Sequence, residues 1–217
     1  MALVGNGYVM KAKLITFEGG EGAGKSTQLS CLAKNLENSG SRVIGLREPG
    51  GTVLGEQLRA VLKNPATKSV EPETEALLFA ACRAQLVREV ILPALAAGTF
   101  VLCDRFIDST VAYQAGGRGL NREQIDAANR LACGTLRPDL TILLDLDPDR
   151  GLSRAAVRDH GQADRFELLG KDFHRKVRAT YRQLAADEPG RFLVVDANRD
   201  PNLIAEEIWH EVRRRFS

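Results

Sequence analysis

The sequence contains few of the residues that build metal centres and disulfide frameworks. Its 217 residues include only 4 cysteines and 3 histidines, which lie far apart and form no C-x-x-C pair. Zinc binding and thioredoxin-like chemistry are therefore not expected. Each cysteine falls within an apolar run, which is typical of a buried reduced thiol. No apolar run reaches the roughly 18 residues that a membrane-spanning helix needs.

The sequence also lacks an excess of charge of either sign. Lys and Arg total 30 against 28 Asp and Glu, and a net charge of +2 does not predict the basic face of a nucleic-acid-binding protein. The first ten residues lack the basic and long apolar regions of a signal peptide. We expect residues 1–12 to form a disordered extension and residues 13–217 a single domain. A cytoplasmic protein without membrane or nucleic-acid partners is the resulting prediction.

A phosphate-binding loop is the most specific feature present. Residues 19–26, GGEGAGKS, fit the pattern G-x-x-x-x-G-K-[ST], with a β-prone run before them and a helix-compatible run after them. The glycines let backbone N–H groups point at a phosphate, and the helix N-terminus adds further donors. Lys25 would reach the β- and γ-phosphates, and the Ser26 hydroxyl would ligate Mg²⁺. A chance glycine-rich turn does not explain this combination.

Strand-like runs alternate with helical patterns along the chain. The runs end at Glu18, near Leu46, at Asp104, at Asp145 and at Asp196. This alternation predicts an α/β fold in which helices cover both faces of a parallel sheet. Ligands of such sheets lie at the carboxyl ends of the strands, where most of these runs carry a carboxylate. We therefore expect the active site at that edge.

Three charged residues at strand ends are candidates for this site. Arg47 precedes a turn rich in proline and glycine, and its guanidinium could bind a phosphate or simply be exposed. Asp104 and Asp145 each follow an apolar strand, the position from which a P-loop protein holds Mg²⁺ or its waters. Composition does not choose between these two carboxylates.

Residues 71–97 predict one long helix. From Ala76 onward it is apolar almost all the way round, so it is expected to be buried on more than one side, and a second subunit could cover one of them. Phe79 and Arg83 lie four residues apart, on one helix face. A phenyl ring beside a guanidinium suits a planar base with a carbonyl edge. A core phenylalanine beside a salt-bridged arginine fits the spacing equally well.

Two later segments could complete a nucleotide site. Small polar and aromatic side chains follow Asp104, namely Ser109, Thr110, Tyr113 and Gln114. They could line a nucleoside pocket, or they could be a helix cap and a packed tyrosine. Residues 151–167 contain Arg154 and Arg158 and are broken by glycine, which suits a lid that closes over phosphates. The alternative for the lid is a solvated helix face.

These motifs, in this order, resemble the thymidylate kinase family of P-loop nucleoside-monophosphate kinases. The resemblance runs from about Lys13 to the C-terminus and rests on ordered motifs: FEGGEGAGKST (17–27), REPGGT (47–52), the helix with Phe79 and Arg83, DRF (104–106), AYQ (112–114), GRG (117–119), PDLT (138–141) and DRFE (164–167). It implies a five-stranded parallel sheet in a P-loop fold and a homodimer packed through helices. It also implies transfer of the ATP γ-phosphate to dTMP, with Mg²⁺, in dTTP synthesis.

The resemblance assigns roles to particular residues. The implied ATP-binding residues are Gly19, Gly20, Glu21, Gly22, Ala23, Gly24, Lys25, Ser26, Thr27, Ala197 and Asn198. The implied dTMP-binding residues are Glu21 at the sugar, Arg47 and Arg105 at the phosphate, Phe79 and Arg83 at the base, and Ser109, Thr110, Tyr113 and Gln114 around the base and sugar. Ser26 and Asp104 would hold the metal, directly or through water. The implied catalytic residues are Lys25, Asp104, Arg105, Arg154 and Arg158.

One departure within the family bears on mechanism. The loop interior, residues 20–23, contains no arginine or lysine, so the chain resembles the bacterial type that supplies cations from the lid. Two other readings of the site remain, a kinase for a different acceptor and a regulatory GTPase. The absence of an Asn-Lys-x-Asp motif counts against the GTPase, and a panel of acceptors would distinguish the kinases.

Overall fold

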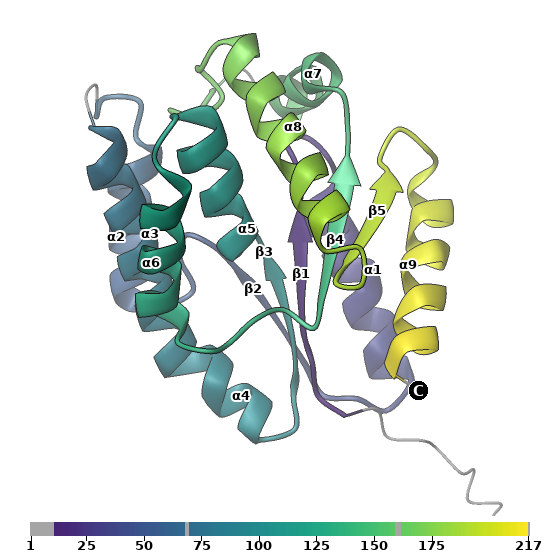
Figure 1. The fold of residues 1–217 in the computed structure, drawn as a ribbon. Coiled ribbons are helices and arrows are strands. Elements are labelled where there is room, and N and C mark those ends of the chain that lie inside the picture. The colour runs from purple at the N-terminus through teal and green to yellow at the C-terminus, as the bar shows by residue number, and fades with distance from the viewer. Residues whose placement is uncertain (1–10, 68–69, 159–161, 217) are drawn as a thin grey trace, which may run out of the picture.

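One parallel sheet forms the centre of the protein. A computed structural model describes residues 11–67, 70–158 and 162–216. The strands are β1 (Leu14–Glu18), β2 (Val43–Arg47), β3 (Phe100–Asp104), β4 (Leu140–Asp145) and β5 (Phe192–Asp196). They lie in the order β2-β3-β1-β4-β5, which confirms the predicted five-stranded parallel sheet (Figure 1). The phosphate-binding loop therefore follows the central strand.

Helices cover both faces of this sheet, as the alternation of elements predicted (Figure 1). They are α1 (Lys25–Asn38), α2 (Val53–Lys63), α3 (Pro72–Leu86), α4 (Leu92–Ala96), α5 (Ile107–Thr110), α6 (Arg122–Cys133), α7 (Pro148–Arg158), α8 (Lys171–Asp187) and α9 (Pro201–Phe216), with π-helical segments η1 (Val87–Ile91) and η2 (Val111–Gly117). Several starts match their sequence signals. Pro148 and Pro201 begin helices, and Asn121 Oδ1 accepts hydrogen bonds from the amides of Glu123 and Gln124.

Successive side chains of the strands enter different cores. On β1, Ile15 belongs to the cluster formed with α1 and α9. Its neighbour Leu14 belongs to the cluster formed with α3, η1 and α6, as does Cys103 of β3. Because successive strand residues point to opposite faces, both faces of the central strands are buried. This is why the strands appear in the sequence as continuous apolar runs.

The predicted long helix is continuous but not regular. It consists of α3, the π-helical turn η1 and α4, and so spans Pro72–Ala96. Pro93 stands in the first turn of α4 and has no N–H to donate to the preceding turn. A wider turn before a proline accommodates that missing hydrogen bond. The segment is therefore a helix with an irregular turn rather than a break.

The cysteines are reduced, and three of the four are buried. Cys82, Cys103 and Cys133 lie in the core, whereas Cys31 is partly exposed. Burial raises the pKa of the Cys82 and Cys133 thiols to about 11. None of the helices in the described residues is long and apolar enough to cross a bilayer. The expected extension lies mostly outside the described residues, which begin at Lys11.

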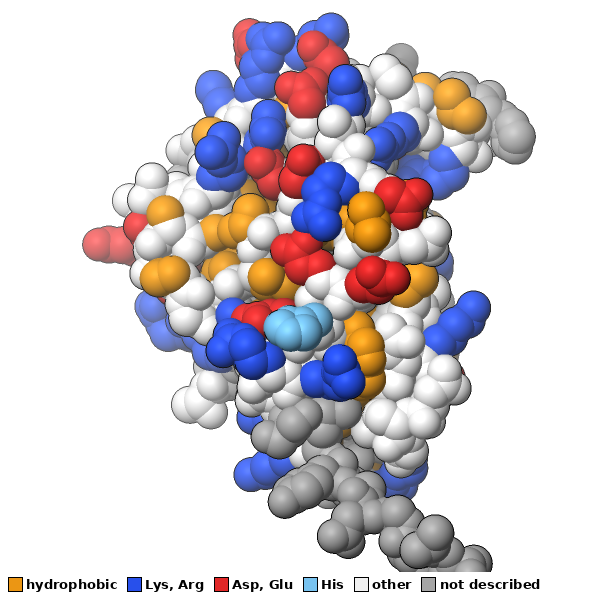
Figure 2. All heavy atoms as spheres, turned by 90° about the vertical axis from the view of Figure 1, so that its right-hand side faces the viewer, with side chains coloured by type: hydrophobic (Ala, Val, Ile, Leu, Met, Phe, Trp, Pro, Cys, Tyr) orange, Lys and Arg blue, Asp and Glu red, His pale blue; other side chains and the backbone are white. Residues whose placement is uncertain are grey.

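The side of the molecule that carries β5 and α9 has intermingled charges of both signs (Figure 2). The run Arg213-Arg214-Arg215 belongs to the last turns of α9. Arg214 and Arg215 both form ion pairs with Glu211, at 2.7 and 2.6 Å. One carboxylate therefore offsets part of the charge of this basic run, and Arg213 stacks over the Trp209 ring.

Candidate active site

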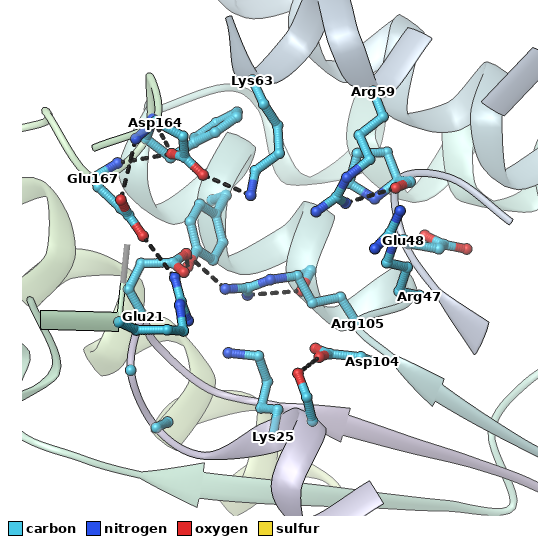
Figure 3. Close-up of a pocket in the computed structure, with 18 of the residues that line it drawn as sticks. Glu21, Lys25, Arg47, Glu48, Arg59, Lys63, Asp104, Arg105, Asp164 and Glu167 are labelled. Carbon is cyan, nitrogen blue, oxygen red and sulfur yellow. Dashed lines mark hydrogen bonds and ion pairs between the residues drawn. The ribbon is translucent and has the colours of Figure 1, made fainter. Parts of the chain in front are cut away.

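A cleft of about 800 Å³ opens at the carboxyl ends of the central strands. Its lining comes from seven parts of the chain: the phosphate-binding loop, the segment at the end of β2, the segment at the end of β3, the last turns of α2, Phe79 of α3, α7, and residues 162–167. Figure 3 shows that charged side chains from these parts converge on one space. The parallel sheet places its strand ends at this edge, as the sequence predicted.

The phosphate-binding loop connects β1 to α1. Its lysine, Lys25, rises from the start of α1 and donates to the carbonyl oxygens of Gly19 and Gly20, at 3.1 and 2.7 Å. Burial, together with the charge of Arg105, lowers the pKa of the Lys25 ammonium to about 8. The loop from Glu21 to Thr27 lines the cleft, whereas Gly19 and Gly20 do not. A phosphate in the loop would meet the free N–H groups and this lysine.

The structure distinguishes the two candidate carboxylates. Asp104 lines the cleft and accepts a hydrogen bond of 2.8 Å from the Ser26 hydroxyl. Asp145 is instead bound through both oxygens by Arg178, at 2.6 and 3.0 Å, and does not line the cleft. The strand end that faces the loop hydroxyl is therefore that of β3.

Ser26 and Asp104 are suitable ligands for a magnesium ion. Hydroxyl and carboxylate oxygens are the ligands that Mg²⁺ prefers, and it usually keeps several waters and nucleotide oxygens. Within the described ranges no three His, Cys, Asp or Glu residues gather as a self-sufficient metal cage. The donor set thus fits an ion that arrives with a nucleotide. Metal binding at these two residues stays a prediction.

Arg105 occupies the centre of the cleft. Its Nη2 forms an ion pair of 2.6 Å with Glu21, and its guanidinium carbon lies 4.9 Å from the ring centroid of Tyr113. The Tyr113 hydroxyl donates to the same Glu21 oxygen at 2.8 Å. Burial alone would raise the pKa of Glu21, but Arg105 and Lys25 outweigh it and hold that pKa at about 2. These three residues, predicted from separate motifs, form one connected group.

A second set of cations comes from β2 and α2. Arg47 is half exposed and pairs with Glu56 at 3.0 Å. Arg59 donates to the carbonyl oxygen of Pro49 at 2.8 Å, and Lys63 pairs with Asp164 at 2.6 Å. Arg47, Arg59 and Lys63 all line the cleft, opposite the phosphate-binding loop (Figure 3). An anion between Arg105 and these side chains would be surrounded by positive charge.

Phe79 and Arg83 share a helix face but have different surroundings. Phe79 lines the cleft and packs against Phe166 with ring centroids 5.8 Å apart. Arg83 has 1% of its surface exposed and does not line the cleft. Its guanidinium is bound by the Glu48 carboxylate at 2.6 Å, the Thr110 hydroxyl, Asn129 Oδ1 and the Phe106 carbonyl. These buried partners occupy the N–H donors of Arg83 in this structure. The contact of Arg83 with a base stays a prediction.

The residues that follow β3 lie where the sequence placed them. Ser109, Thr110, Tyr113 and Gln114 all line the cleft. Gln114 donates to the buried carboxylate of Glu75 at 2.9 Å, which fixes its side chain. The Thr110 hydroxyl accepts a hydrogen bond of 2.8 Å from the Arg83 guanidinium. This wall is polar and lines the same cleft as Phe79, as suits a nucleoside pocket.

The two predicted lid arginines face the cleft from α7. Arg154 donates to the Ala197 carbonyl at 3.1 Å, and Arg158 pairs with Glu167 at 3.1 Å. Ala197 and the next residue, Asn198, follow β5 beside α7 and do not line the cleft. The predicted lid, residues 151–167, includes positions 159–161, which lie outside the described residues.

Helix α7 lies directly against the phosphate-binding loop because both surfaces carry glycine. A Cβ atom on Gly22 would collide with the carbonyl oxygen of Gly151, and one on Gly151 would collide with that of Glu21. Gly22 also has φ +64°, which disfavours other residues. The close approach keeps the lid arginines near the loop.

The sequence analysis assigned no role in the site to several residues that line or support the cleft, although some of them belong to the motifs named above. They are Glu18, Glu48, Arg59, Lys63, Asp164, Phe166 and Tyr181. Arg59 and Lys63 lie four residues apart on a helix that starts beside Arg47, so their spacing was a usable signal. Glu18 and Tyr181 are hydrogen-bonded although they lie 163 residues apart in the sequence. No local sequence pattern predicts such a contact.

Comparison with known proteins agrees with this geometry. A family model described as thymidylate kinase matches residues 17–208. The chain is 49% identical over 207 residues to a thymidylate kinase of Trichlorobacter lovleyi, covering 94% of this chain and 98% of that protein. It is 51% identical over 201 residues to one of Deinococcus radiodurans, covering 93% and 96%.

A solved structure gives the same result in three dimensions. The crystal structure of thymidylate kinase from Ehrlichia chaffeensis matches with a TM-score of 0.76 at 31% identity, covering 94% of this chain and 99% of that one. The family model and the relatives span nearly the whole domain that holds the loop, Arg105 and the cleft. The chain therefore belongs to the thymidylate kinase family.

Proposed function

We propose that this protein transfers the γ-phosphate of ATP to dTMP, giving ADP and dTDP in dTTP synthesis. The observation that carries the proposal is the pairing, in one cleft, of a phosphate-binding loop with a second cationic site and an aromatic wall. Two anionic nucleotides can meet there with their phosphates between Lys25 and Arg105. Family membership supports the same activity.

The donor half of the site would hold ATP. Residues Gly19 to Thr27 would wrap its phosphates, with Lys25 at the β- and γ-phosphates. Ser26 and Asp104 would hold Mg²⁺, directly or through water, and the ion would neutralise negative charge on the ATP phosphates. The backbone at Ala197 and Asn198 would border the adenine.

The acceptor half would hold dTMP. Arg105 and Arg47 would bind its phosphate, and the position of Arg59 supports adding it to them. Phe79 would stack on thymine beside Thr110 and Gln114. Glu21 and Tyr113, already hydrogen-bonded to each other, would face the deoxyribose.

Catalysis would rest on positioning and charge neutralisation. The acceptor oxygen belongs to a phosphate that is already an anion, so no strong general base is required. Closely placed cations lower the repulsion between the two nucleotides. Arg154 and Arg158 would bring further positive charge next to the transferred phosphoryl group as α7 closes. Closure would also exclude water, which could otherwise accept the γ-phosphate.

Two further proposals concern the protein as a whole. We infer a homodimer from apolar side chains that remain exposed on α2, α3 and α6, as argued below. A cytoplasmic location stays a prediction from the sequence.

A coupled ADP-release assay over a panel of acceptors tests the proposed function. The panel contains dTMP, dUMP, dCMP, dGMP, AMP and thymidine, and one sample without acceptor. We expect dTMP to give the highest kcat/KM and the acceptor-free sample almost no turnover. A higher kcat/KM for another acceptor would mean that the protein is a kinase for that acceptor instead. Rapid hydrolysis of GTP, measured separately without an acceptor, would favour the GTPase.

A further inference from the structure

A buried carboxylate that the proposed reaction does not use lies beneath Arg105. Glu18 is the last residue of β1, and none of its surface is exposed. One of its oxygens accepts hydrogen bonds from the amides of Phe106 and Ser109, at 2.8 and 3.3 Å. The other accepts from the hydroxyls of Ser109 and Tyr181, at 2.6 and 2.7 Å. The carboxylate thus accepts four hydrogen bonds, about as many as its two oxygens can accept, and we call Glu18 with these donors the hub.

The backbone of Arg105 needs such support. Among the residues that the structure describes, Arg105 alone combines a positive φ, +72°, with a residue other than glycine. A left-handed conformation of this kind costs roughly 1–3 kcal/mol and persists only where neighbouring contacts hold it. The amide of Arg105 donates to Phe17 at 2.9 Å, and the next amide, of Phe106, donates to Glu18. Glu18 thus holds one of the two hydrogen bonds that flank the strained residue.

The side chain of Arg105 depends on the same hub. Its Nη1 lies 3.4 Å from both the Ser109 and the Tyr181 hydroxyl oxygens, and it also donates to the Gly19 carbonyl at 3.1 Å. The two hydroxyl oxygens also lie 2.8 Å from each other, and either one can donate across that contact. A hydroxyl that donates to Glu18 turns its lone pairs toward the other hydroxyl and the guanidinium. The opposite nitrogen of Arg105 pairs with Glu21. Contacts on both sides therefore determine where the guanidinium points.

We infer that Glu18 is a positioning residue for the acceptor phosphate, acting through Ser109, Tyr181 and the backbone of residues 105–106 on Arg105. The inference rests on the proposed role of Arg105 in binding dTMP. Glu18 itself does not line the cleft, so it acts only through these groups. Burial and the nearby Asp108 raise the pKa of Glu18 to about 7, while Ser109, Arg105 and Tyr181 act to lower it. Its charge state is therefore tied to the groups that it holds.

Substitution of Glu18 by Gln in the full chain tests this role. The Gln carbonyl can still accept from the Phe106 amide, but its NH₂ group makes a hydroxyl turn its hydrogen toward Arg105. We expect the KM for dTMP to rise at least about tenfold while the KM for ATP and kcat each change less than about threefold. Tyr181→Phe removes one hydroxyl of the same relay, and we expect it to raise the KM for dTMP in the same direction.

Asp145→Asn is the matched control for a loss of charge at the end of a neighbouring strand. The Asp145 side chain is 18% exposed, is bound by Arg178 at 2.6 and 3.0 Å, and does not line the cleft. This variant should lower the thermal midpoint while leaving the KM for dTMP unchanged. If Glu18→Gln and Tyr181→Phe both fold and leave the KM for dTMP unchanged, or if Asp145→Asn reproduces their kinetics, the inference is overturned.

A further variant separates this inference from the proposed function. Arg105→Met should raise the KM for dTMP strongly if Arg105 binds the acceptor. If it does so while the Glu18 and Tyr181 variants do not, only the positioning role is wrong. If Arg105→Met has no effect on dTMP, the proposed acceptor site and this inference are both wrong.

Discussion

The guanidinium groups of Arg83 and Arg105 lie near the same pocket but have different freedom to move. Arg83 is held by a carboxylate, a hydroxyl, an amide oxygen and a carbonyl, and all of these are buried. Arg105 has one short ion pair, with Glu21, a hydrogen bond of 3.1 Å to the Gly19 carbonyl, and two long contacts of 3.4 Å to hydroxyls. A phosphate can therefore recruit Arg105 with fewer strong contacts to replace than at Arg83. Arg83 would have to give up partners before it could meet a ligand.

Removing the Arg83 charge should therefore affect stability first. In Arg83→Met the Glu48 carboxylate would remain buried without its cation, and breaking a buried pair in this way typically costs about 3–5 kcal/mol. Urea unfolding followed by circular dichroism measures the change. Arg122→Met, which breaks a largely exposed pair with Asp126, is the control and should cost less than about 1 kcal/mol. Equal losses in both variants would contradict this view of Arg83.

Phe79 should act as the platform for the base. Phe79→Ala is expected to weaken dTMP binding by about 1–3 kcal/mol, the usual value for base–aromatic stacking. ATP binding should barely change, because Phe79 lies on the acceptor side of the cleft. Calorimetric titration with each nucleotide measures both effects. If Phe79→Ala weakens both nucleotides equally, Phe79 is only a core residue.

The ionisation of Glu18 should make stability depend on pH. Its pKa is raised from 4.5 to about 7, chiefly by burial. Between these values the folded protein binds a proton that the unfolded chain has released, so its contribution to stability declines as pH rises from about 4.5 to 7. The lowered pKa of His174 acts in the opposite direction within the same range.

The difference between wild type and Glu18→Gln isolates the Glu18 contribution, because His174 is common to both. The unfolding free energy of the wild type relative to the variant should fall with rising pH. Denaturant titrations at several pH values measure it. A difference that is flat from pH 4.5 to 7 would count against a raised pKa at Glu18.

At the scale of elements, α7 links the two halves of the site. Its N-terminal half packs on the phosphate-binding loop through Gly151, and its C-terminal half reaches residue Glu167 through Arg158. Phe166, next to Glu167, packs on Phe79. A movement of α7 can therefore change both the position of the phosphate-binding loop and the position of Phe79. This arrangement suits a lid that responds to both nucleotides.

The arginines of α7 should contribute to the transition state rather than to acceptor binding. We expect Arg154→Met or Arg158→Met to lower kcat at least about 100-fold, since arginine fingers elsewhere contribute roughly 10³–10⁵. The KM for dTMP should move much less, because the contact strengthens only as charge develops on the transferred group. Steady-state kinetics with both substrates varied measure the two constants.

Arg175→Met is a suitable control for the lid variants. Arg175 is an exposed arginine of α8 that pairs with Asp172 at 3.0 Å, away from the cleft. Its loss should leave kcat unchanged. If Arg154→Met, Arg158→Met and the double variant all keep a kcat near that of the wild type, these arginines form only a solvated face.

At the scale of the whole molecule, three adjoining helices leave large apolar side chains in solvent. Val53 of α2, Leu77 of α3 and Leu131 of α6 are 80, 64 and 85% exposed. Helix α3 packs against both α2 and α6, and these helices lie on one side of the molecule (Figure 1). Exposed apolar groups on neighbouring elements are typical of an interface. A second copy of the chain can cover them with the same surface about a two-fold axis.

The protein should therefore be a homodimer in solution. Light scattering at micromolar concentration is expected to give twice the 23.7 kDa mass of the chain. Leu77→Glu should shift that mass toward the monomer, because it would bury a charge in the interface. Leu203→Glu, at a half-exposed position of α9, should not. A monomer mass for the wild type would refute the proposed dimer.

Much of this protein was determined locally in the sequence. The loop that binds phosphate is contiguous, its glycines and Lys25 have a required spacing, and the apolar runs before Glu18 and Asp104 end where the strands end. Helix starts at Asn121 and Pro148 follow from caps within a few residues. Such signals need no knowledge of the rest of the chain, because the hydrogen bonds that they describe are local.

The choice among partners was decided only by the tertiary structure. Composition left Asp104 and Asp145 equivalent, and only the family resemblance favoured Asp104, until the sheet placed one beside Ser26 and the other beside Arg178. Spacing likewise left Arg83 open between a base contact, which the resemblance implies, and a salt bridge. Each outcome depends on groups tens of residues away that meet only when strands take the order β2-β3-β1-β4-β5. The sequence determines the charge of each side chain, but the packing of the sheet and helices determines which groups pair with it.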